Sequence, residues 1–261
     1  MRSPTSLVIL LAALASSGAQ AAPGPAGAAA AEIWPVEVAP LDTTALAAQR
    51  TRIDQAATTL PPELAPAVRY QKTFSGILSG APAKGWSGEV TRMAEATGDD
   101  AMTRGLREVG KFWVARLAMD EINAALRGFY LHEIRFPENL SLIQANLPPG
   151  VQRDPWGEPW VYKLKAPAAF GSLNGQGYAL GPARMPSLSL LRHVQQPRHL
   201  VTPAWKVTVV TAGGRPALEF RNGGNVSLIQ PGGVADGCVL LFIGEDWALL
   251  AQVDQLFAVA F

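Results

Sequence analysis

Side chains that could carry out chemistry are few in this 261-residue chain. A zinc site needs histidines and cysteines at ligand spacing. The three histidines, His132, His193 and His199, form no His-x-x-x-His pair and have no cysteine nearby. The sequence also lacks a Gly-x-Ser-x-Gly nucleophile motif and a Walker phosphate-binding loop. We therefore expect no metal site, no bound cofactor and no catalytic residues.

Acidic residues occur in adjacent pairs that could suggest acid–base catalysis. Neighbouring side chains point in different directions on a helix or strand, so caps, solvated faces and turns explain such pairs better. The sequence leaves open a second possibility, a carboxylate pair that the fold assembles from distant positions, as in glycosidases. The adjacent pairs are Asp99-Asp100, Asp120-Glu121 and Glu245-Asp246.

Residues 1–21 have the pattern of a cleavable secretory signal peptide. Arg2 gives the basic start, Leu7 to Leu14 the apolar run and Ala19-Gln20-Ala21 the cleavage site. A retained anchor is the alternative, although this run is short for a bilayer. We therefore expect a periplasmic or secreted protein with no integral membrane span after cleavage, which partners could hold at the membrane.

Charge and cysteine content narrow the function further. Cleavage would remove one of the 22 basic residues and none of the 21 acidic residues, so the two would balance. Nothing in this balance argues for nucleic acid, which would call for a clustered basic face. The single Cys238 excludes an intramolecular disulfide despite the oxidising compartment. Because Cys238 precedes the apolar run 239–243, we expect a buried small side chain rather than a reactive thiol.

The densest cluster of proline, tryptophan and glycine lies near the middle of the chain. Asp154 can accept backbone N–H bonds across a turn, Pro155 presets φ, and Gly157 can adopt a positive φ. Trp160 and Tyr162 alternate with Val161, as in a strand with one face on a helix. We expect these residues to determine the fold, with partner binding as the alternative. The run is Asp154-Pro155-Trp156-Gly157-Glu158-Pro159-Trp160-Val161-Tyr162, between Phe136-Pro137 and Gly177-Tyr178-Ala179-Leu180-Gly181-Pro182.

Over about residues 112–184 these segments resemble the C-terminal domain of the major pseudopilins of type II secretion systems. That family has a long helix with Ile-x-x-Ala-Leu-x-x-Tyr, a Tyr-Pro or Phe-Pro step, Asp-Pro-Trp-Gly-x-Pro-Tyr-x-Tyr, and Tyr-Ser-Leu-Gly. The first of these is matched by Ile122-Asn123-Ala124-Ala125-Leu126-Arg127-Gly128-Phe129-Tyr130. The resemblance implies that Tyr130, Pro137, Tyr178 and Gly181 belong to the same structural motif as residues 154–162.

Two features depart from the family. The N-terminal methylation signal inside a long apolar helix is absent, so the protein could not pack into a pseudopilus as a major subunit does. The acidic residues that hold calcium in the family are replaced by Gly181-Pro182-Ala183-Arg184, and calcium needs several oxygen ligands. We therefore expect no calcium site.

The first hundred residues predict helices and loops. Residues 22–40 are rich in Ala, Pro and Gly and are expected to form a flexible linker. A helix is predicted from Leu41 to Leu60, with Asp42 as its N-cap. Residues 63–99 are expected to form short helices and loops, because glycines and prolines interrupt them.

The strongest predicted helix begins after the N-cap Asp100 and ends near Tyr130. Gly105 and Gly110 weaken its early turns by about 1 kcal/mol each relative to alanine. Its charged residues largely fall outside one apolar stripe. The stripe consists of Leu106, Val109, Trp113, Leu117, Ile122, Leu126 and Phe129.

Residues 186–203 are expected to be a linker, and short strands follow it. Glycine turns such as Gly213-Gly214 separate them and predict a small antiparallel barrel or sandwich. Residues 204–261 have a fainter resemblance to the small periplasmic β-domains of secretion and pilus alignment proteins, which residues 233–243 and 246–250 carry. The predicted strands are residues 205–211, 217–220, 226–229, 238–243, 247–253 and 256–261.

We thus predict an α+β protein. A helical and loop region (41–99) precedes a pseudopilin-like domain (100–185), in which a long helix packs on a small antiparallel sheet. A small all-β domain, a barrel or a sandwich, follows at 204–261.

The expected function is that of a non-enzymatic exported accessory or adaptor component of a type II secretion or type IV pilus-like system. It would contact envelope secretion or pilus proteins through an exposed sheet edge or an aromatic patch near Trp156 and Trp160. One alternative is a free periplasmic binding module with a reused pseudopilin-like fold. Another is a secreted hydrolase, which an apolar-lined pocket with convergent acids would favour.

Overall fold

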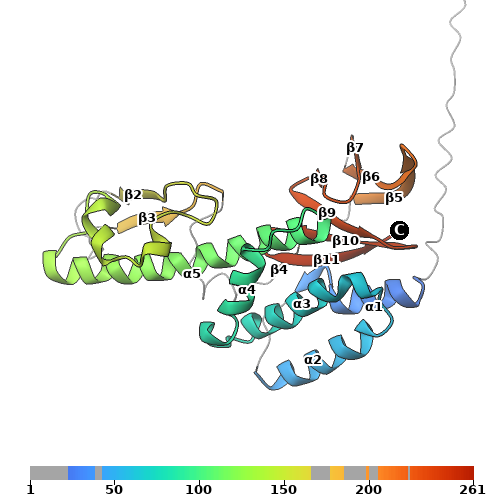
Figure 1. The fold of residues 1–261 in the computed structure, drawn as a ribbon, viewed down its shortest axis with the longest axis horizontal. Coiled ribbons are helices and arrows are strands. Elements are labelled where there is room, and N and C mark those ends of the chain that lie inside the picture. The colour runs from blue at the N-terminus through green and yellow to red at the C-terminus, as the bar shows by residue number, and fades with distance from the viewer. Residues whose placement is uncertain (1–22, 39–42, 166–176, 185–197, 200–204, 223) are drawn as a thin grey trace, which may run out of the picture.

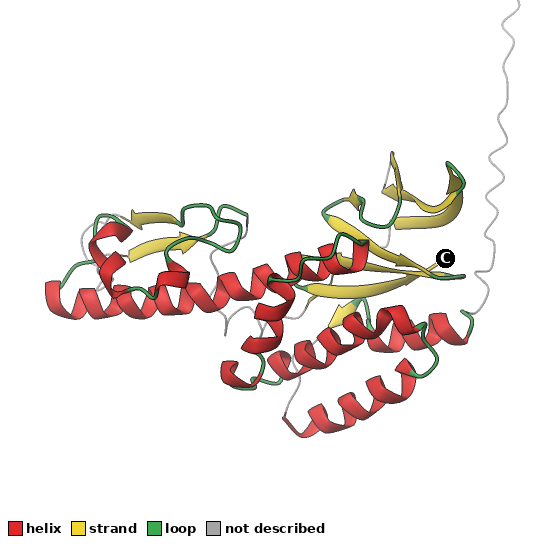
Figure 2. Ribbon diagram, viewed as in Figure 1, coloured by secondary structure: helices red, strands yellow, loops and turns green. Residues whose placement is uncertain are grey.

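The computed structural model describes residues 23–38, 43–165, 177–184, 198–199, 205–222 and 224–261. A single long helix, α5, runs through the molecule and carries helices and strands along both of its halves (Figure 1). Four shorter helices gather near its first half (Figure 2). The helices are α1 (Pro25–Ile33), α2 (Thr43–Ala57), α3 (Ala65–Leu78), α4 (Ser87–Ala94) and α5 (Ala101–Glu133), with short 3-10 turns η1 (Pro62–Leu64), η2 (Ala83–Gly85), η3 (Leu140–Asn146) and η4 (Pro149–Val151).

The described strands pair antiparallel throughout, in the orders β1-β4, β2-β3, β5-β6-β7 and β11-β10-β9-β8. A long helix with several small antiparallel sheets confirms the α+β class. The strands are β1 (Glu37–Val38), β2 (Val161–Lys165), β3 (Gly177–Gly181), β4 (Arg198–His199), β5 (Trp205–Ala212), β6 (Arg215–Asn222), β7 (Asn225–Ile229), β8 (Val234–Ala235), β9 (Cys238–Ile243), β10 (Trp247–Gln252) and β11 (Gln255–Ala260).

The β8–β11 sheet is buried on both faces. Alternate residues of a strand point to opposite faces: on β10, Trp247 and Leu249 join the core formed with the helices, whereas Ala248 and Leu250 face the β5–β7 sheet. Phe257 on β11 and Phe220 on β6 belong to the second of these cores. The C-terminal strands therefore share a hydrophobic core with the N-terminal helices as well as with one another.

The flexible linker predicted for residues 22–40 is wrong for residues 25–33, which form α1. Ala30 and Ile33 are fully buried, and Trp34 stacks on Trp247 with ring centroids 6.2 Å apart. Asp246 accepts a hydrogen bond from the Gly24 N–H at the start of the helix, across 222 positions of sequence. The composition suggested a linker because small alanines bury little surface alone, yet they allow close packing on a distant sheet.

The other predicted helices are present with shifted bounds. The helix predicted at 41–60 is α2, and its predicted cap Asp42 lies outside the described residues. The Asp100 cap is confirmed: its carboxylate accepts a 2.9 Å hydrogen bond from the Thr103 N–H. This bond lowers the pKa of Asp100. The predicted signal peptide (1–21) and most of the predicted linker at 186–203 also fall outside the description.

The six predicted C-terminal strands are present as β5–β7 and β9–β11. Gly213 and Gly214 both have positive φ, which the tight hairpin turn between β5 and β6 requires. The short strand β8 was missed, because two residues carry no periodicity. No described helix is long and apolar enough to cross a membrane.

Gly110 lets α4 and α5 cross closely. A Cβ at this position would lie 2.6 Å from the Ala94 nitrogen and 2.8 Å from the Val90 carbonyl oxygen. Both are backbone atoms, which cannot rotate away as a side chain can. The helix-weakening glycine seen in the sequence is therefore required by the packing of a neighbouring helix.

We predict that Gly110→Ala lowers the free energy of unfolding by about 2 kcal/mol, because overpacking outweighs the gain in helix propensity. Gly128→Ala is the matched control on the same helix, since a Cβ there meets nothing within 4 Å. It should raise stability by up to about 1 kcal/mol. Urea unfolding monitored by circular dichroism distinguishes the two; equal effects would contradict this account.

A buried ion pair holds the turn between β10 and β11 against α5. The Arg116 guanidinium lies 3.1 Å from an Asp254 carboxylate oxygen, and their side chains are 3% and 5% exposed. The Tyr70 hydroxyl of α3 donates to the Asp254 carbonyl oxygen and accepts a 2.8 Å bond from Trp113 Nε1. Arg116 also lies over the Trp113 ring. One turn is thus bonded to two helices.

We predict that Asp254→Ala costs about 3–5 kcal/mol, because it leaves the Arg116 charge buried without its carboxylate. The double variant Arg116→Met with Asp254→Leu should cost clearly less, since no buried charge is then left alone. Chemical denaturation measures both. A double variant at least as unstable as Asp254→Ala would contradict the coupling.

Candidate interaction site

Among the described residues, those that could do chemistry do not converge. His132 lies exposed in the last turn of α5, the backbone of His199 pairs with that of Glu37 in the β1–β4 register, and His193 lies outside the description. Within the described ranges, no three His, Cys, Asp or Glu residues are grouped so that they could hold a metal ion. Cys238 is fully buried, and burial with the nearby Asp236 charge raises its thiol pKa to about 12. This thiol is therefore protonated at neutral pH.

The three adjacent acidic pairs lie at different places in the fold. Asp100 caps α5, and Asp246 bonds to the start of α1. Asp120 is partly buried on α5, and that burial raises its pKa. Each pair thus contributes to a cap, a turn or a helix face, as adjacent carboxylates should.

Asp154 organises the central turn. Its Oδ1 atom accepts hydrogen bonds from the N–H groups of Trp156 at 3.0 Å and Glu158 at 2.8 Å. Its backbone N–H donates to the Glu158 carbonyl, and its own carbonyl accepts from Gly157, whose φ is +85°. Asp154 is only 4% exposed. The carboxylate therefore replaces the solvent that these amides would otherwise need.

The aromatic residues of the motif form hydrogen bonds at several places along α5 and in η4. Trp156 Nε1 donates to Glu108 of α5 at 2.7 Å, and the ring meets Phe112 edge-on. Tyr178 donates to Asn123 of α5 at 2.8 Å. Trp160 Nε1 donates to the Val151 carbonyl.

The flanking residues join the same cluster. The Tyr162 hydroxyl donates to the Pro137 carbonyl at 2.7 Å, and Tyr130 packs on Phe136 with ring centroids 4.7 Å apart. Gly181 lies opposite Val161 in the β2–β3 pair. Burial raises the pKa values of Tyr162 and Tyr178. The structure thus brings the predicted site residues together around one small core.

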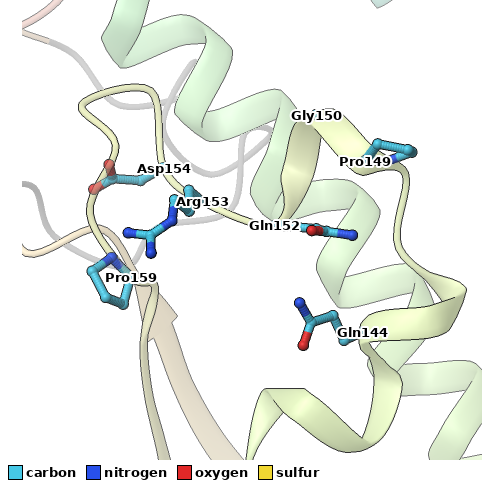
Figure 3. Close-up of a pocket in the computed structure, with 7 residues that line it drawn as sticks. All are labelled: Gln144, Pro149, Gly150, Gln152, Arg153, Asp154 and Pro159. Carbon is cyan, nitrogen blue, oxygen red and sulfur yellow. The ribbon is translucent and has the colours of Figure 1, made fainter.

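The aromatic patch suggested near Trp156 and Trp160 is not a surface feature. Trp160 is only 9% exposed, and Trp156 is half-buried against α5 with Arg184 over its ring. What the motif does present is an open cleft of about 420 Å³ (Figure 3). Asp154 and Pro159 line it together with Gln144, Pro149, Gly150, Gln152 and Arg153. The one carboxylate among these lining residues, that of Asp154, already accepts hydrogen bonds from the N–H groups of the turn.

One group of exposed apolar side chains lies at the end of α5, and another lies on β7 and β8 (Val226, Leu228 and Val234). Leu131 is 81% exposed, Ile134 80% and Leu142 of η3 56%. Leu142 lines a groove of about 720 Å³ beside α5, together with Ala124, Gly128, Phe129 and Glu133 among others. Leu131 lies seven residues after Ala124 and thus on the same helix face. We call the groove together with Leu131 and Ile134 the distal surface.

Ile134 has a backbone conformation that its side chain disfavours. It ends α5 at φ +57°, where its N–H donates to the Tyr130 carbonyl. Glycine or asparagine is usual in this left-handed position, which β-branched residues rarely adopt. A strained and exposed isoleucine does not serve the stability of the helix end.

The distal surface was missed in the sequence, although it left a signal. Leu131 lies nine positions after Ile122, which is two and a half turns of helix. It therefore falls on the side opposite Ile122, Leu126 and Phe129, the buried apolar residues of the second half of the helix. An isolated leucine on a polar helix face, followed by Ile134 outside the helix, was the recognisable pattern.

Comparison of the chain with protein-family models, with curated proteins and with solved structures gives no match.

We predict that Asp154→Ala lowers the free energy of unfolding by about 2 kcal/mol, because two turn N–H groups lose their acceptor. Glu158→Ala is the control: its side chain is exposed and only its backbone joins the turn, so the change should stay within about 0.5 kcal/mol. Thermal unfolding followed by tryptophan fluorescence measures both. Equal stability of the two variants would show that the carboxylate does not organise the turn.

Proposed function

We propose that this protein is a non-enzymatic, exported accessory or adaptor component of a type II secretion or type IV pilus-like system. It would act through protein–protein contacts with envelope proteins of that system. Residues 1–21 would direct export to the periplasm or the exterior, and the rest would carry no membrane span. This assignment rests on the pseudopilin-like motif in the sequence and on the surface beside it.

The arrangement around residues 154–162 supports the resemblance. Pseudopilin-like packing of a long helix on a small antiparallel sheet corresponds here to β2 and β3 against the second half of α5, joined by the Tyr178–Asn123 bond. For the C-terminal strands we propose a sandwich rather than a barrel. The β5–β7 and β8–β11 sheets meet through one core that contains Phe220 and Phe257.

The distal surface is the observation that carries the proposal of an adaptor. The exposed Leu142 lines the groove, and the exposed Leu131 and Ile134 lie at the end of the same helix. Apolar groups clustered in this way mark sites of protein association. Among the described residues that line the cleft beside Asp154, its carboxylate is the only one and its Oδ1 atom is bonded to the turn, so this lining supplies no acid pair for hydrolysis.

We predict that Ile134→Gly separates binding from stability. Relief of the left-handed strain should raise the free energy of unfolding by about 1 kcal/mol. Loss of the exposed side chain should at the same time reduce recovery of secretion or pilus components in a crosslinking pulldown from intact cells. Leu131→Ser should reduce this recovery without the gain in stability.

Val226→Ser is the control for this experiment, because Val226 is 57% exposed on β7, away from α5. It should leave the recovered partners unchanged. Recovery of a free protein without secretion or pilus components would overturn the proposal in favour of a free periplasmic binding module. If both Leu131→Ser and Ile134→Gly left the recovery of partners unchanged, the distal surface would not be the binding site of the proposed adaptor.

A further inference from the structure

A second surface feature lies at the other end of the molecule, among the N-terminal helices. A cleft of about 620 Å³ opens between α2, α3 and the connection to α4. Its apolar lining includes Leu46, Ala81, Pro82 and the largely buried Trp86, whose Nε1 donates to the Ala81 carbonyl. The apolar part of the cleft is thus fixed by a bonded tryptophan.

Four basic side chains line this cleft: Arg50, Arg69, Lys72 and Lys84. Lys72 pairs with Asp54 of α2. Arg50, Arg69 and Lys84 form no ion pair with any described residue, and all three are exposed. Cations collected in one cleft repel one another, so an anionic occupant would relieve an electrostatic cost.

Arg50 of α2 approaches α3 closely. Its guanidinium nitrogen would lie 3.2 Å from a Cβ placed on Gly76. The side chain of Arg50 therefore reaches across from α2 to α3. This approach brings a cation of one helix into the cleft beside the cations of the other.

The charges are spread along the cleft rather than focused on one point. Arg69, Lys72 and Gly76 occupy one face of α3 over two turns, a length of about 10 Å. Arg50 faces them from α2, and Lys84 lies beyond the end of α3, in η2. Such a spacing suits several carboxylates in succession, with apolar side chains between them.

We propose that this cleft is a docking site for an acidic, partly apolar peptide segment of a partner protein. Carboxylates of the segment would pair with Arg50, Arg69 and Lys84, and its apolar residues would cover Leu46 and Trp86. The proposal goes beyond the function proposed above and does not depend on the distal surface. A lipid headgroup fits less well, because the cations line a recess between helices instead of a flat exposed face.

The full chain can be titrated with a fluorescein-labelled peptide that alternates glutamate and leucine, and polarisation measures binding. The same peptide with lysine in place of glutamate is the ligand control. The double variant Arg50→Glu with Lys84→Glu should raise the Kd at least about tenfold, because two attractive contacts become repulsive. Added salt should weaken binding of the unaltered chain.

Arg52→Glu is the matched control variant. Arg52 lies exposed on the same helix, two positions from Arg50, and does not line the cleft. It should change the Kd less than about twofold. The proposal is overturned if the glutamate peptide does not bind, or if Arg52→Glu weakens it as much as the double variant. It is equally overturned if Arg50 and Lys84 instead mediate binding only to vesicles containing phosphatidylglycerol.

Discussion

The buried contact between Arg116 and Asp254 is the constraint on which the arrangement of the whole molecule depends. Arg116 lies on α5 between two cores: Trp113 belongs to the core of the N-terminal helices, and Ala115 to the core under β2 and β3. Asp254 lies in the turn that joins β10 to β11, and Tyr70 of α3 bonds to its carbonyl. Helices from the first half of the chain and strands from its end are therefore fixed to the same point on α5. A buried charge without its partner is strongly destabilising, so few other arrangements of α5 and this turn are possible.

Local signals in the sequence predicted those helices and turns whose caps and turn residues lie within the element itself. Asp100 is the cap that its position suggested, and Gly213 and Gly214 form a hairpin turn with positive φ. The role of Asp154 as an acceptor of turn N–H groups was also predictable, because the prolines and glycine around it already specify a turn.

Long-range packing was not predictable in this way. Helix α1 is buried because Trp34 and Ile33 meet strands more than two hundred positions away, and nothing in its own composition shows this. Gly110 looked like a weakness of α5 until the backbone of α4 was seen beside it. The candidate surfaces were missed for a related reason. Leu131 left a weak signal as an apolar residue on a polar helix face, whereas the cleft around Arg50 is formed by residues of separate helices that only the fold brings together.

The continuity of α5 sets a distance as well as a fold. Its 33 residues form one helix without an internal proline, and a helix of that length is about 50 Å long. One end is clamped among helices and strands, and the other projects with its own small core (Figure 1). The molecule is thus built around a rigid strut. A group held at the far end of α5 lies at a fixed distance from the clamped end, and thermal motion of loops does not alter that distance. Alignment of two bodies at a set separation is a task that such a strut performs without any moving part.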